Sequence, residues 1–199
     1  MSRREFFDKH AENWDENITV TDTSKIDYIL KMADIRTGEM VLDIGCGTGV
    51  ILPNLKKMVG KQGRVTALDI SPKMLARARE KFADSFDYVE GDVHFLPFKE
   101  KRFDKVVCFN AFPHFQDKPK ALFEIFKVLR PKGVFTVAHS ASREEINALH
   151  KEVGNVVKND RIPDEEKMYV LFKEAGFINI RIIDSKDLYL ASGIKNTGL

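Results

Sequence analysis

The sequence is poor in cysteine, in tryptophan and in charge of one sign. Its 199 residues include two cysteines and one tryptophan, and 32 basic residues nearly balance 30 acidic ones. Two cysteines cannot build the disulfide framework of a small secreted domain, so we expect reduced thiols in a cytoplasmic protein. A net charge of +2 excludes a nucleic-acid binder that relies on bulk electrostatic attraction, and no nucleic-acid partner is expected.

Long apolar runs are also absent. No window approaches the roughly 20 apolar residues of a membrane span, and the first ten residues carry charges where a signal peptide needs an apolar stretch. We therefore predict no membrane insertion. With 43% hydrophobic residues the chain can still bury a core, and we predict one domain over residues 1–199. The composition leaves the oligomeric state open.

Short apolar runs alternate with longer amphipathic stretches. Five runs predict buried strands, at residues 40–44, 65–70, 86–90, 103–109 and 133–139. Ser71 with Pro72, and Asp117 or Lys118 with Pro119, are typical helix starts. Strands that are separated by helices favour an α/β fold, in which a parallel sheet is covered by helices on both faces.

The two ends of the chain differ from this alternation. Apolar runs at 177–183 and 188–190 are separated by four residues, too few for a parallel crossover, so we predict an antiparallel pair. Residues 1–35 indicate one or two helices with Phe6, Phe7 and Trp14 on an apolar stripe. This stripe fits either a lid over a binding site or a helix packed on the sheet.

A glycine-rich loop follows the first predicted strand. Asp43 precedes three glycines spaced as G-x-G-x-G, one residue tighter at the end than the dinucleotide fingerprint G-x-G-x-x-G. A carboxylate beside such a loop is unfavourable for pyrophosphate but suits a ligand with an ammonium group. Asp69 and Asp92 follow the next two strands, so all three carboxylates are expected at the edge where open α/β sheets bind ligands.

Five motifs in this stretch resemble, in order, those of class I S-adenosylmethionine-dependent methyltransferases. They occupy residues 41–49, 67–71, 91–98, 103–104 and 129–133. The pattern is most similar to the small-molecule type, such as the quinone-biosynthesis C-methyltransferases. Lys132 departs from it, because the family usually has glycine there, and we expect this turn variant to leave cofactor binding unaffected.

The resemblance implies a Rossmann-like three-layer sandwich whose seven-stranded sheet is mostly parallel, with one antiparallel strand at the C-terminus. It divides the chain into an N-terminal helical lid (1–35), a cofactor-binding core (36–139), and acceptor-pocket helices with the final strand pair (140–199). It also implies S-adenosylmethionine as the methyl donor and S-adenosylhomocysteine as the product. The residues implied to bind this cofactor are Asp43, Gly45, Cys46, Gly47, Thr48, Gly49, Asp69, Ile70, Asp92, Val93 and Asn110.

The resemblance also implies individual roles. Asp43 would lie near the amino group of the cofactor, Asp69 would accept from both ribose hydroxyls, and Asp92 would accept from the adenine amino group. Ile70 and Val93 would flank the adenine ring. Asn110 would face the cofactor and the acceptor.

Histidines near the ends of the fourth and fifth strands are candidates for a catalytic base. His114 lies in an aromatic-rich loop, His139 ends the fifth strand, and His150 follows one helical stretch later. We predict catalytic roles for His114 and His139. The alternative is a divalent-metal site formed by His114, His139 and His150 that orients the acceptor, but their spacing matches no metal motif, so no metal site is expected.

The predicted function is methyl transfer to a small-molecule acceptor through O, N, S or activated carbon. Three alternatives stay open: an RNA or protein methyltransferase, a nicotinamide-dependent oxidoreductase, and a non-catalytic S-adenosylmethionine-binding protein. The early third glycine and Asp43 disfavour the oxidoreductase. The identity of the acceptor cannot be derived from these motifs.

Overall fold

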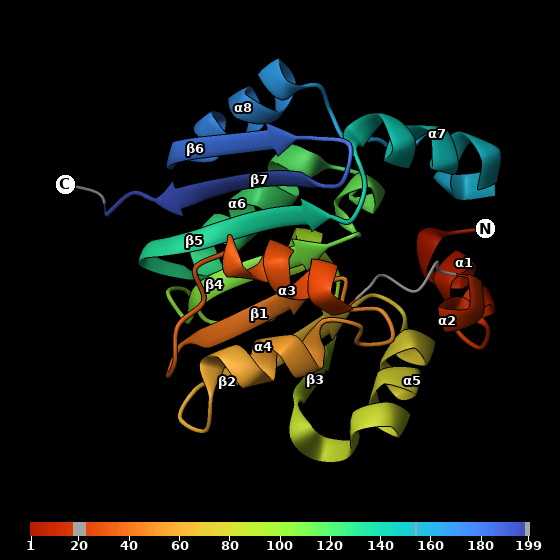
Figure 1. The fold of residues 1–199 in the computed structure, drawn as a ribbon, viewed down its shortest axis with the longest axis horizontal. Coiled ribbons are helices and arrows are strands. Elements are labelled where there is room, and N and C mark those ends of the chain that lie inside the picture. The colour runs from red at the N-terminus through yellow and green to blue at the C-terminus, as the bar shows by residue number, and fades with distance from the viewer. Residues whose placement is uncertain (18–22, 154, 198–199) are drawn as a thin grey trace.

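A seven-stranded sheet with helices on both faces organises the molecule (Figure 1). The structure is a computed structural model that describes residues 1–17, 23–153 and 155–197. The strand order is β3-β2-β1-β4-β5-β7-β6. All neighbouring strands are parallel except for β7, which runs antiparallel to both β5 and β6. The predicted α/β sheet and its antiparallel terminal pair are confirmed.

The predicted strands are all present. They are β1 (Met40–Ile44), β2 (Arg64–Asp69), β3 (Asp87–Glu90), β4 (Phe103–Phe109), β5 (Leu129–His139), β6 (Phe177–Asp184) and β7 (Tyr189–Lys195). β5 begins four residues before the predicted start at Gly133, because Leu129 already pairs with Phe103 of β4. β7 extends beyond the predicted 188–190 to Lys195, which pairs with Phe177.

Helices cover the sheet in two layers. The α-helices are α1 (Arg3–His10), α2 (Trp14–Asn17), α3 (Thr23–Lys31), α4 (Leu52–Val59), α5 (Pro72–Phe82), α6 (Lys118–Val128), α7 (Arg143–Val153) and α8 (Glu165–Glu174). Short 3-10 turns are η1 (Ala83–Ser85), η2 (Val93–Phe95), η3 (Phe112–His114) and η4 (Asn155–Val157). α3, α4 and α5 bury their apolar sides on one face of the sheet, whereas α6 and α8 bury theirs on the other. This arrangement is the three-layer sandwich expected from the motifs.

The helix starts follow their sequence signals. Ser71 caps α5, since its Oγ accepts a hydrogen bond from the backbone N–H of Met74 at 3.1 Å. Asp117 caps α6 by accepting from the backbone N–H of Lys120 at 3.0 Å. A cap satisfies backbone donors that have no partner inside the helix, so each of these residues fixes where its helix begins.

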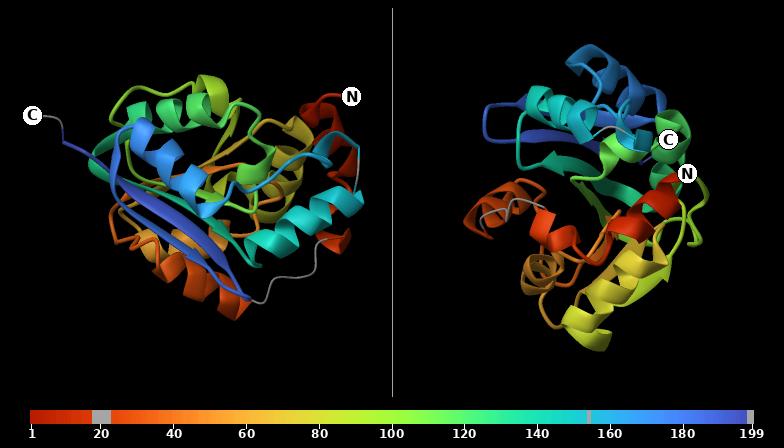
Figure 2. Two further views of the ribbon diagram at one scale, coloured as in Figure 1. Left: turned by 90° about the horizontal axis from the view of Figure 1, so that it is seen from above. Right: turned by 90° about the vertical axis from the view of Figure 1, so that its right-hand side faces the viewer.

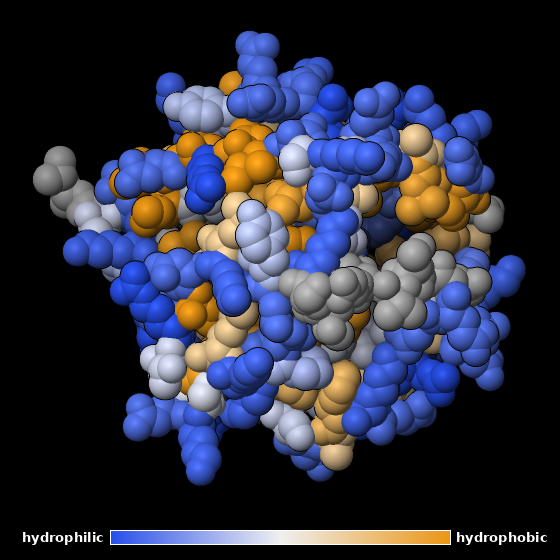
Figure 3. Space-filling view, in the orientation of Figure 1, coloured by the Kyte–Doolittle hydropathy of each residue, from blue (hydrophilic) through white to orange (hydrophobic). Residues whose placement is uncertain are grey.

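The first helices lie beside the carboxyl end of the sheet rather than on its face. The two views of Figure 2 place α1 at that end, close to α5, while α3 packs on the sheet. Figure 3 shows a largely hydrophilic face with apolar areas over the β5–β7 region and over α7. No helix within the described ranges has the length and apolar character needed to span a bilayer.

Candidate functional site

A cavity of about 800 Å³ opens at the carboxyl ends of β1, β2 and β4. The strand order reverses here, because β1 leads to β2 on one side and lies next to β4 on the other, and open α/β sheets bind ligands at such a point. Most of the predicted cofactor residues line the cavity, namely Gly45, Cys46, Gly47, Thr48, Asp69, Ile70, Asp92, Val93 and Asn110. The other two, Asp43 and Gly49, lie outside the lining.

The glycine loop has a shape that larger residues cannot adopt. Gly45 has a φ of 71°, and a Cβ there would lie 2.5 Å from the Cβ of Ala111. Gly49 has a φ of 87°, and a Cβ would lie 2.9 Å from side-chain atoms of Leu52 and Phe82. Both positions combine a left-handed backbone with close packing, which explains the glycines at this spacing. The loop therefore presents backbone, not side chain, to the cavity.

Asp43 is a buried carboxylate without a protein partner. Its residue is 1% exposed, and neither carboxylate oxygen has a hydrogen bond. Burial, with the nearby Asp69 as the second cause, raises the pKa of Asp43 to about 8. Leaving a buried polar group unpaired is costly, so this carboxylate, next in sequence to the cavity-lining Ile44 and Gly45, fits a cationic ligand group.

Asp69 and Asp92 lie on the cavity wall with different partners. Asp69 accepts hydrogen bonds from the backbone N–H of Gly47 at 2.8 Å and of Ser71 at 2.9 Å. Burial raises the pKa of Asp69 to about 6, and these backbone bonds partly offset the rise. Oδ1 of Asp92 accepts from the backbone N–H and from Nδ1 of His94, at 2.9 and 2.6 Å. Each carboxylate is thus fixed in orientation at the cavity.

Asn110 holds a strained backbone at the end of β4. Its φ is 54°, which is unusual for a residue with a side chain. Its backbone N–H donates to the carbonyl of Ala138 at 2.9 Å, and its Oδ1 accepts from the backbone N–H of Ser140 at 3.3 Å. Such strain persists where surrounding contacts fix it, and it concentrates at functional sites.

The N-terminal segment forms part of the cavity wall. Phe7 and Trp14 line the cavity, whereas Phe6 is buried beside Phe7 with the ring centroids 5.4 Å apart. Asp15 accepts a hydrogen bond from Oγ1 of Thr48 at 2.5 Å, so α2 is joined to the glycine loop.

A second carboxylate of this segment contacts the start of α5. Asp8 accepts from Oγ of Ser71 at 2.6 Å, which joins α1 to the start of α5. No sequence motif indicated Asp8 or Asp15, because isolated acidic residues on short helices show no recognisable spacing.

Two of the three candidate histidines lie together. The rings of His114 and His150 are 4.8 Å apart, and His114 lines the cavity. His139 is buried outside the lining, 1% exposed, with neither ring nitrogen hydrogen-bonded. Burial, and next the rings of His114 and His150, lower the pKa of His139 to about 3, so this ring is neutral at physiological pH.

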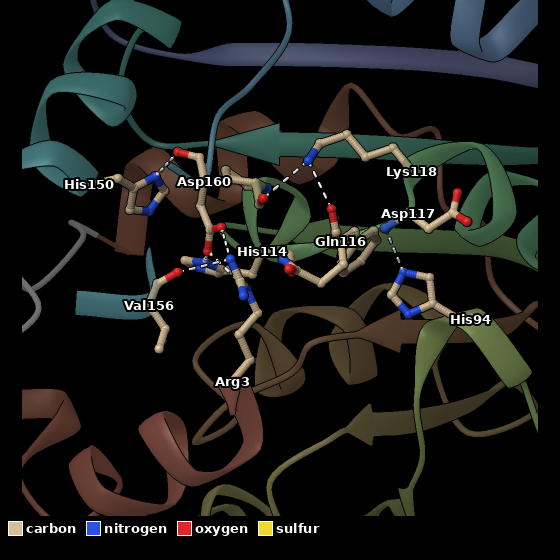
Figure 4. A network of polar contacts seen from close by, with 11 residues as sticks. Arg3, His94, His114, Gln116, Asp117, Lys118, His150, Val156 and Asp160 are labelled. Carbon is tan, nitrogen blue, oxygen red and sulfur yellow. Dashed lines mark hydrogen bonds and ion pairs between the residues drawn. The ribbon is translucent and has the colours of Figure 1, made fainter. Parts of the chain in front are cut away.

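Asp160, which no motif had indicated, joins this group. It is 4% exposed and accepts a hydrogen bond from Nδ1 of His114 at 2.7 Å. Arg3 of α1 binds the same carboxylate through its guanidinium group (Figure 4). The break in amphipathic pattern around residues 159–163 was visible in the sequence, but nothing there showed that it would reach His114.

His94 lines the cavity, but both of its ring nitrogens have partners. Nδ1 donates to Asp92 at 2.6 Å, and Nε2 accepts from the backbone N–H of Asp117 at 3.1 Å. By contrast, no residue in the described ranges hydrogen-bonds Nε2 of His114. Within the same ranges no group of three or more His, Cys, Asp or Glu side chains is arranged to hold a metal ion.

Comparisons with known proteins agree with this architecture. A family model described as a methyltransferase domain matches residues 41–133. Ubiquinone/menaquinone biosynthesis C-methyltransferase UbiE of Edwardsiella ictaluri is 31% identical over 180 residues, covering 76% of this chain and 71% of that protein. Demethylmenaquinone methyltransferase of Staphylococcus aureus strain JH9 is 30% identical over 184 residues, covering 77% and 74%.

A solved structure shows the same fold over the whole chain. A Haloferax volcanii protein, solved in complex with the Trm112 methyltransferase activator, superposes with a TM-score of 0.82 at 22% identity and covers 100% of this chain and 99% of that one. The comparisons do not favour the oxidoreductase, the RNA or protein methyltransferase, or the non-catalytic alternative. The chain belongs to the class I S-adenosylmethionine-dependent methyltransferases, similar to those of quinone biosynthesis, and transfers a methyl group from S-adenosylmethionine to a small-molecule acceptor.

Proposed function

We propose that the acceptor is a reduced, hydroxyl-bearing aromatic ring of the quinone type, methylated at carbon, with His114 as the base. The observation that carries this proposal is the position of His114, which lines the cavity while Asp160 binds Nδ1 and leaves Nε2 open. The relatives named above act in ubiquinone and menaquinone biosynthesis. A hydroxyl on the ring gives such a base a proton to remove.

The cofactor is assigned to the side of the cavity formed by β1, β2 and β3. In this proposal the loop at residues 45–49 runs along the methionine part, and Asp43 pairs with its amino group. Asp69 accepts from the ribose hydroxyls and Asp92 from the adenine amino group. The orphaned carboxylate of Asp43 and the cavity-lining position of residues 45–48 support this orientation.

The remaining predicted cofactor residues complete this side. Ile70 and Val93 flank the adenine ring, Cys46 and Thr48 lie along the loop, and Asn110 separates the cofactor from the acceptor. These residues line the cavity, and that placement supports the assignment.

The acceptor is assigned to the side of the cavity formed by η3 and the N-terminal helices. Phe7 and Trp14 supply aromatic surface there, and Phe115 adds to it, which suits a planar ring. Helices α1 and α2 act as the lid over this side. Residues 140–199 support the pocket from behind, through Asp160, since the lining residues of the described chain all precede residue 121.

The chemistry needs alignment and one proton acceptor. S-adenosylmethionine supplies an activated methyl group, and S-adenosylhomocysteine remains after its transfer. The cavity walls hold the acceptor in line with that group, a contribution that reaches about 7–11 kcal/mol in well-aligned reactions. Nε2 of His114 takes the hydroxyl proton, which directs electron density into the ring, and a positioned base is worth about 10²–10⁴-fold. Once the ring carbon holds the methyl group, its own hydrogen leaves as a proton and the ring oxygen is protonated again, so the net product of the step is one proton released to solvent. His139, neutral and buried, keeps a supporting position behind His114.

The direct test is methyl transfer to a matched pair of acceptors. The protein would be incubated with methyl-labelled S-adenosylmethionine and a short-chain demethylmenaquinone analogue, either chemically reduced or oxidised, with an ethanolamine phosphate as a nitrogen acceptor for comparison. We expect label in the ring of the reduced analogue alone, detected by mass spectrometry. Label on the nitrogen acceptor, or no label in the reduced ring by a protein that binds S-adenosylhomocysteine, would overturn the proposed acceptor class.

A further inference from the structure

Asp160 lies at the centre of a polar cluster that joins four separate segments of the chain (Figure 4). Its carboxylate binds His114 of η3 and Arg3 of α1. Its backbone carbonyl accepts from Nδ1 of His150 in α7 at 3.0 Å, and its backbone N–H donates to the carbonyl of Val157 at 2.9 Å. Both the backbone and the side chain of Asp160 are therefore fixed.

We propose that Asp160 is a positioning residue that holds His114 in the tautomer and orientation of a general base, with Arg3 balancing its charge. The inference rests on the base role proposed for His114 and adds two residues to it. A carboxylate on Nδ1 keeps the proton on that nitrogen, so the lone pair lies on Nε2. When Nε2 takes a hydroxyl proton, the Nδ1 proton stays in place, Asp160 remains ionised, and the new proton leaves later to solvent.

Arg3 has a defined electrostatic part in this arrangement. An unbalanced buried carboxylate would hold the imidazole in its protonated form, which cannot accept a proton. The Arg3 guanidinium donates to both oxygens of Asp160, to Oδ1 and, through Nε at 3.3 Å, to Oδ2. Oδ2 also accepts from Nδ1 of His114 at 2.7 Å. Burial alone would raise the pKa of Asp160, but the hydrogen bonds from His114 and Arg3 outweigh it and hold the pKa below its usual range. Asp160 thus stays ionised while Arg3 neutralises most of its field.

The turn that carries His114 is fixed by the side chain of Lys118. Nζ of Lys118 donates to the carbonyls of Pro113 at 3.1 Å and Phe115 at 2.9 Å, on either side of His114. Burial lowers the pKa of Lys118. On the open side the ring packs edge-on against Phe7, 5.0 Å between centroids. The ring is held by Asp160 at one nitrogen and by aromatic contact at its face.

The charged and titratable groups around His114 come from every element packed against it. They are Arg3 of α1, Lys118 of α6, His139 of β5, His150 of α7 and Asp160. Burial is the leading cause that lowers the pKa of both His139 and His150. These two rings are neutral at physiological pH, so Asp160, Arg3 and Lys118 dominate the field at His114.

The test combines a spectroscopic readout with a pH profile. In the protein bound to S-adenosylhomocysteine, ¹⁵N NMR of the His114 ring should show a proton on Nδ1. In Asp160→Asn the amide donates to Nδ1, so the proton should move to Nε2. For Asp160→Asn we expect kcat to fall at least about tenfold with little change in KM. The acidic limb of its pH profile should move to lower pH, because the His114 imidazole loses the carboxylate that favours its protonated form.

Two further variants separate positioning from simple damage to the fold. Arg3→Gln removes the balancing cation, so the Nδ1 tautomer should persist while the acidic limb moves to higher pH, opposite to Asp160→Asn. Asp164→Asn is the matched control, because Asp164 caps α8 four residues further on and binds Lys167 instead. Asp164→Asn should leave the tautomer of His114 and the pH profile of kcat unchanged.

The outcomes distinguish this inference from the proposed acceptor. Two results would overturn the positioning role whatever the acceptor is. The first is a proton on Nε2 of His114 in the wild-type protein. The second is a His114 tautomer and a pH profile that are the same in wild type and Asp160→Asn. Absence of transfer to the reduced ring with an Nδ1 proton on His114 would overturn the acceptor class alone. Asp160→Glu should recover part of the lost kcat, since a carboxylate returns to Nδ1.

Discussion

The two sides of the cavity are built from the sequence in different ways. The residues that line the cofactor side come from strand ends between positions 44 and 110, where adjacent parallel strands bring successive motifs to one edge. The acceptor side joins His114 to Asp160, 46 positions away, and Asp160 to Arg3, 157 positions away. The first side follows from local pattern and topology, whereas the second depends on how distant segments pack.

This difference has a functional consequence. Changes on the cofactor side should impair cofactor binding, while changes on the acceptor side should spare binding and impair turnover. Binding of S-adenosylhomocysteine, measured by calorimetry, and methyl transfer, measured at saturating cofactor, therefore separate the two sides.

The largest effect is expected for Asp43→Asn. Truncating one partner of a buried charge pair costs about 2–5 kcal/mol, so the affinity for S-adenosylhomocysteine should fall roughly 30-fold or more. Because the pKa of Asp43 is about 8, the free protein carries a proton there at pH 7. Pairing with the cofactor amino group should release most of that proton, which titrations in buffers of different ionisation enthalpy measure, and the variant should release none.

The same residue predicts a pH dependence of stability. The pKa of about 8 is above the value near 4 of an unfolded aspartate, so the folded state holds the extra proton. The free energy of unfolding of the free protein should therefore fall as pH rises from about 4 to about 8. Asp43→Asn should lack this component. Asp104→Asn, at the opposite end of the neighbouring strand β4, where it accepts from the backbone of Met40, should leave cofactor affinity unchanged.

A smaller effect is expected for Gly45→Ala, compared with Gly38→Ala. Both glycines have positive φ, 71° and 89°, but a Cβ at Gly38 meets nothing within 4 Å. Each alanine should cost about 1–2 kcal/mol of stability for the left-handed backbone. Gly45→Ala should cost about 1–3 kcal/mol more, because of the contact with Ala111. Denaturant unfolding measures both costs.

The comparison of Gly45→Ala with Gly38→Ala also tests whether the shape of the glycine loop governs cofactor binding. Gly45→Ala should weaken the binding of S-adenosylhomocysteine, because displacing Ala111 moves the loop that lines the cofactor side. Gly38→Ala should bind as the wild type does. Equal affinity in both variants would contradict the role of loop shape in cofactor binding.

Much of the fold was predictable because its signals are local. β1 and β4 match the predicted ranges, and Ser71 and Asp117 cap the helices they were expected to start. Each of these features depends on a few neighbouring residues. The start of β5 was missed by four residues, because the pairing of Leu129 with Phe103 is a contact between strands that no single run of sequence displays.

The site was predictable to a different extent on its two sides. The resemblance to the methyltransferase family implied eleven cofactor residues, and nine of them line the cavity. On the acceptor side the sequence indicated His114, but not Asp160 or Arg3. A lone carboxylate in a loop and an arginine near the start of the chain have no periodicity, and long-range packing alone brings them to the histidine. His150 and His139 show the same limit, because the first contacts His114 whereas the second is buried outside the cavity lining.

The smallest effect is expected at Lys132, which belongs to neither side. This exposed residue has a φ of 65° and makes a left-handed turn inside β5, between the residues that pair with Phe103 and Lys105 of β4, where a side chain costs about 1–2 kcal/mol. Lys132→Gly removes that cost but adds about 0.5–1 kcal/mol of backbone entropy on folding, so a net gain of up to about 1.5 kcal/mol should appear in denaturant unfolding. Lys132→Ala keeps the left-handed penalty and should gain nothing. Cofactor affinity and turnover should match the wild type in both variants, because the turn is outside the cavity lining; a change in either would show that the two sides of the cavity are coupled through β5.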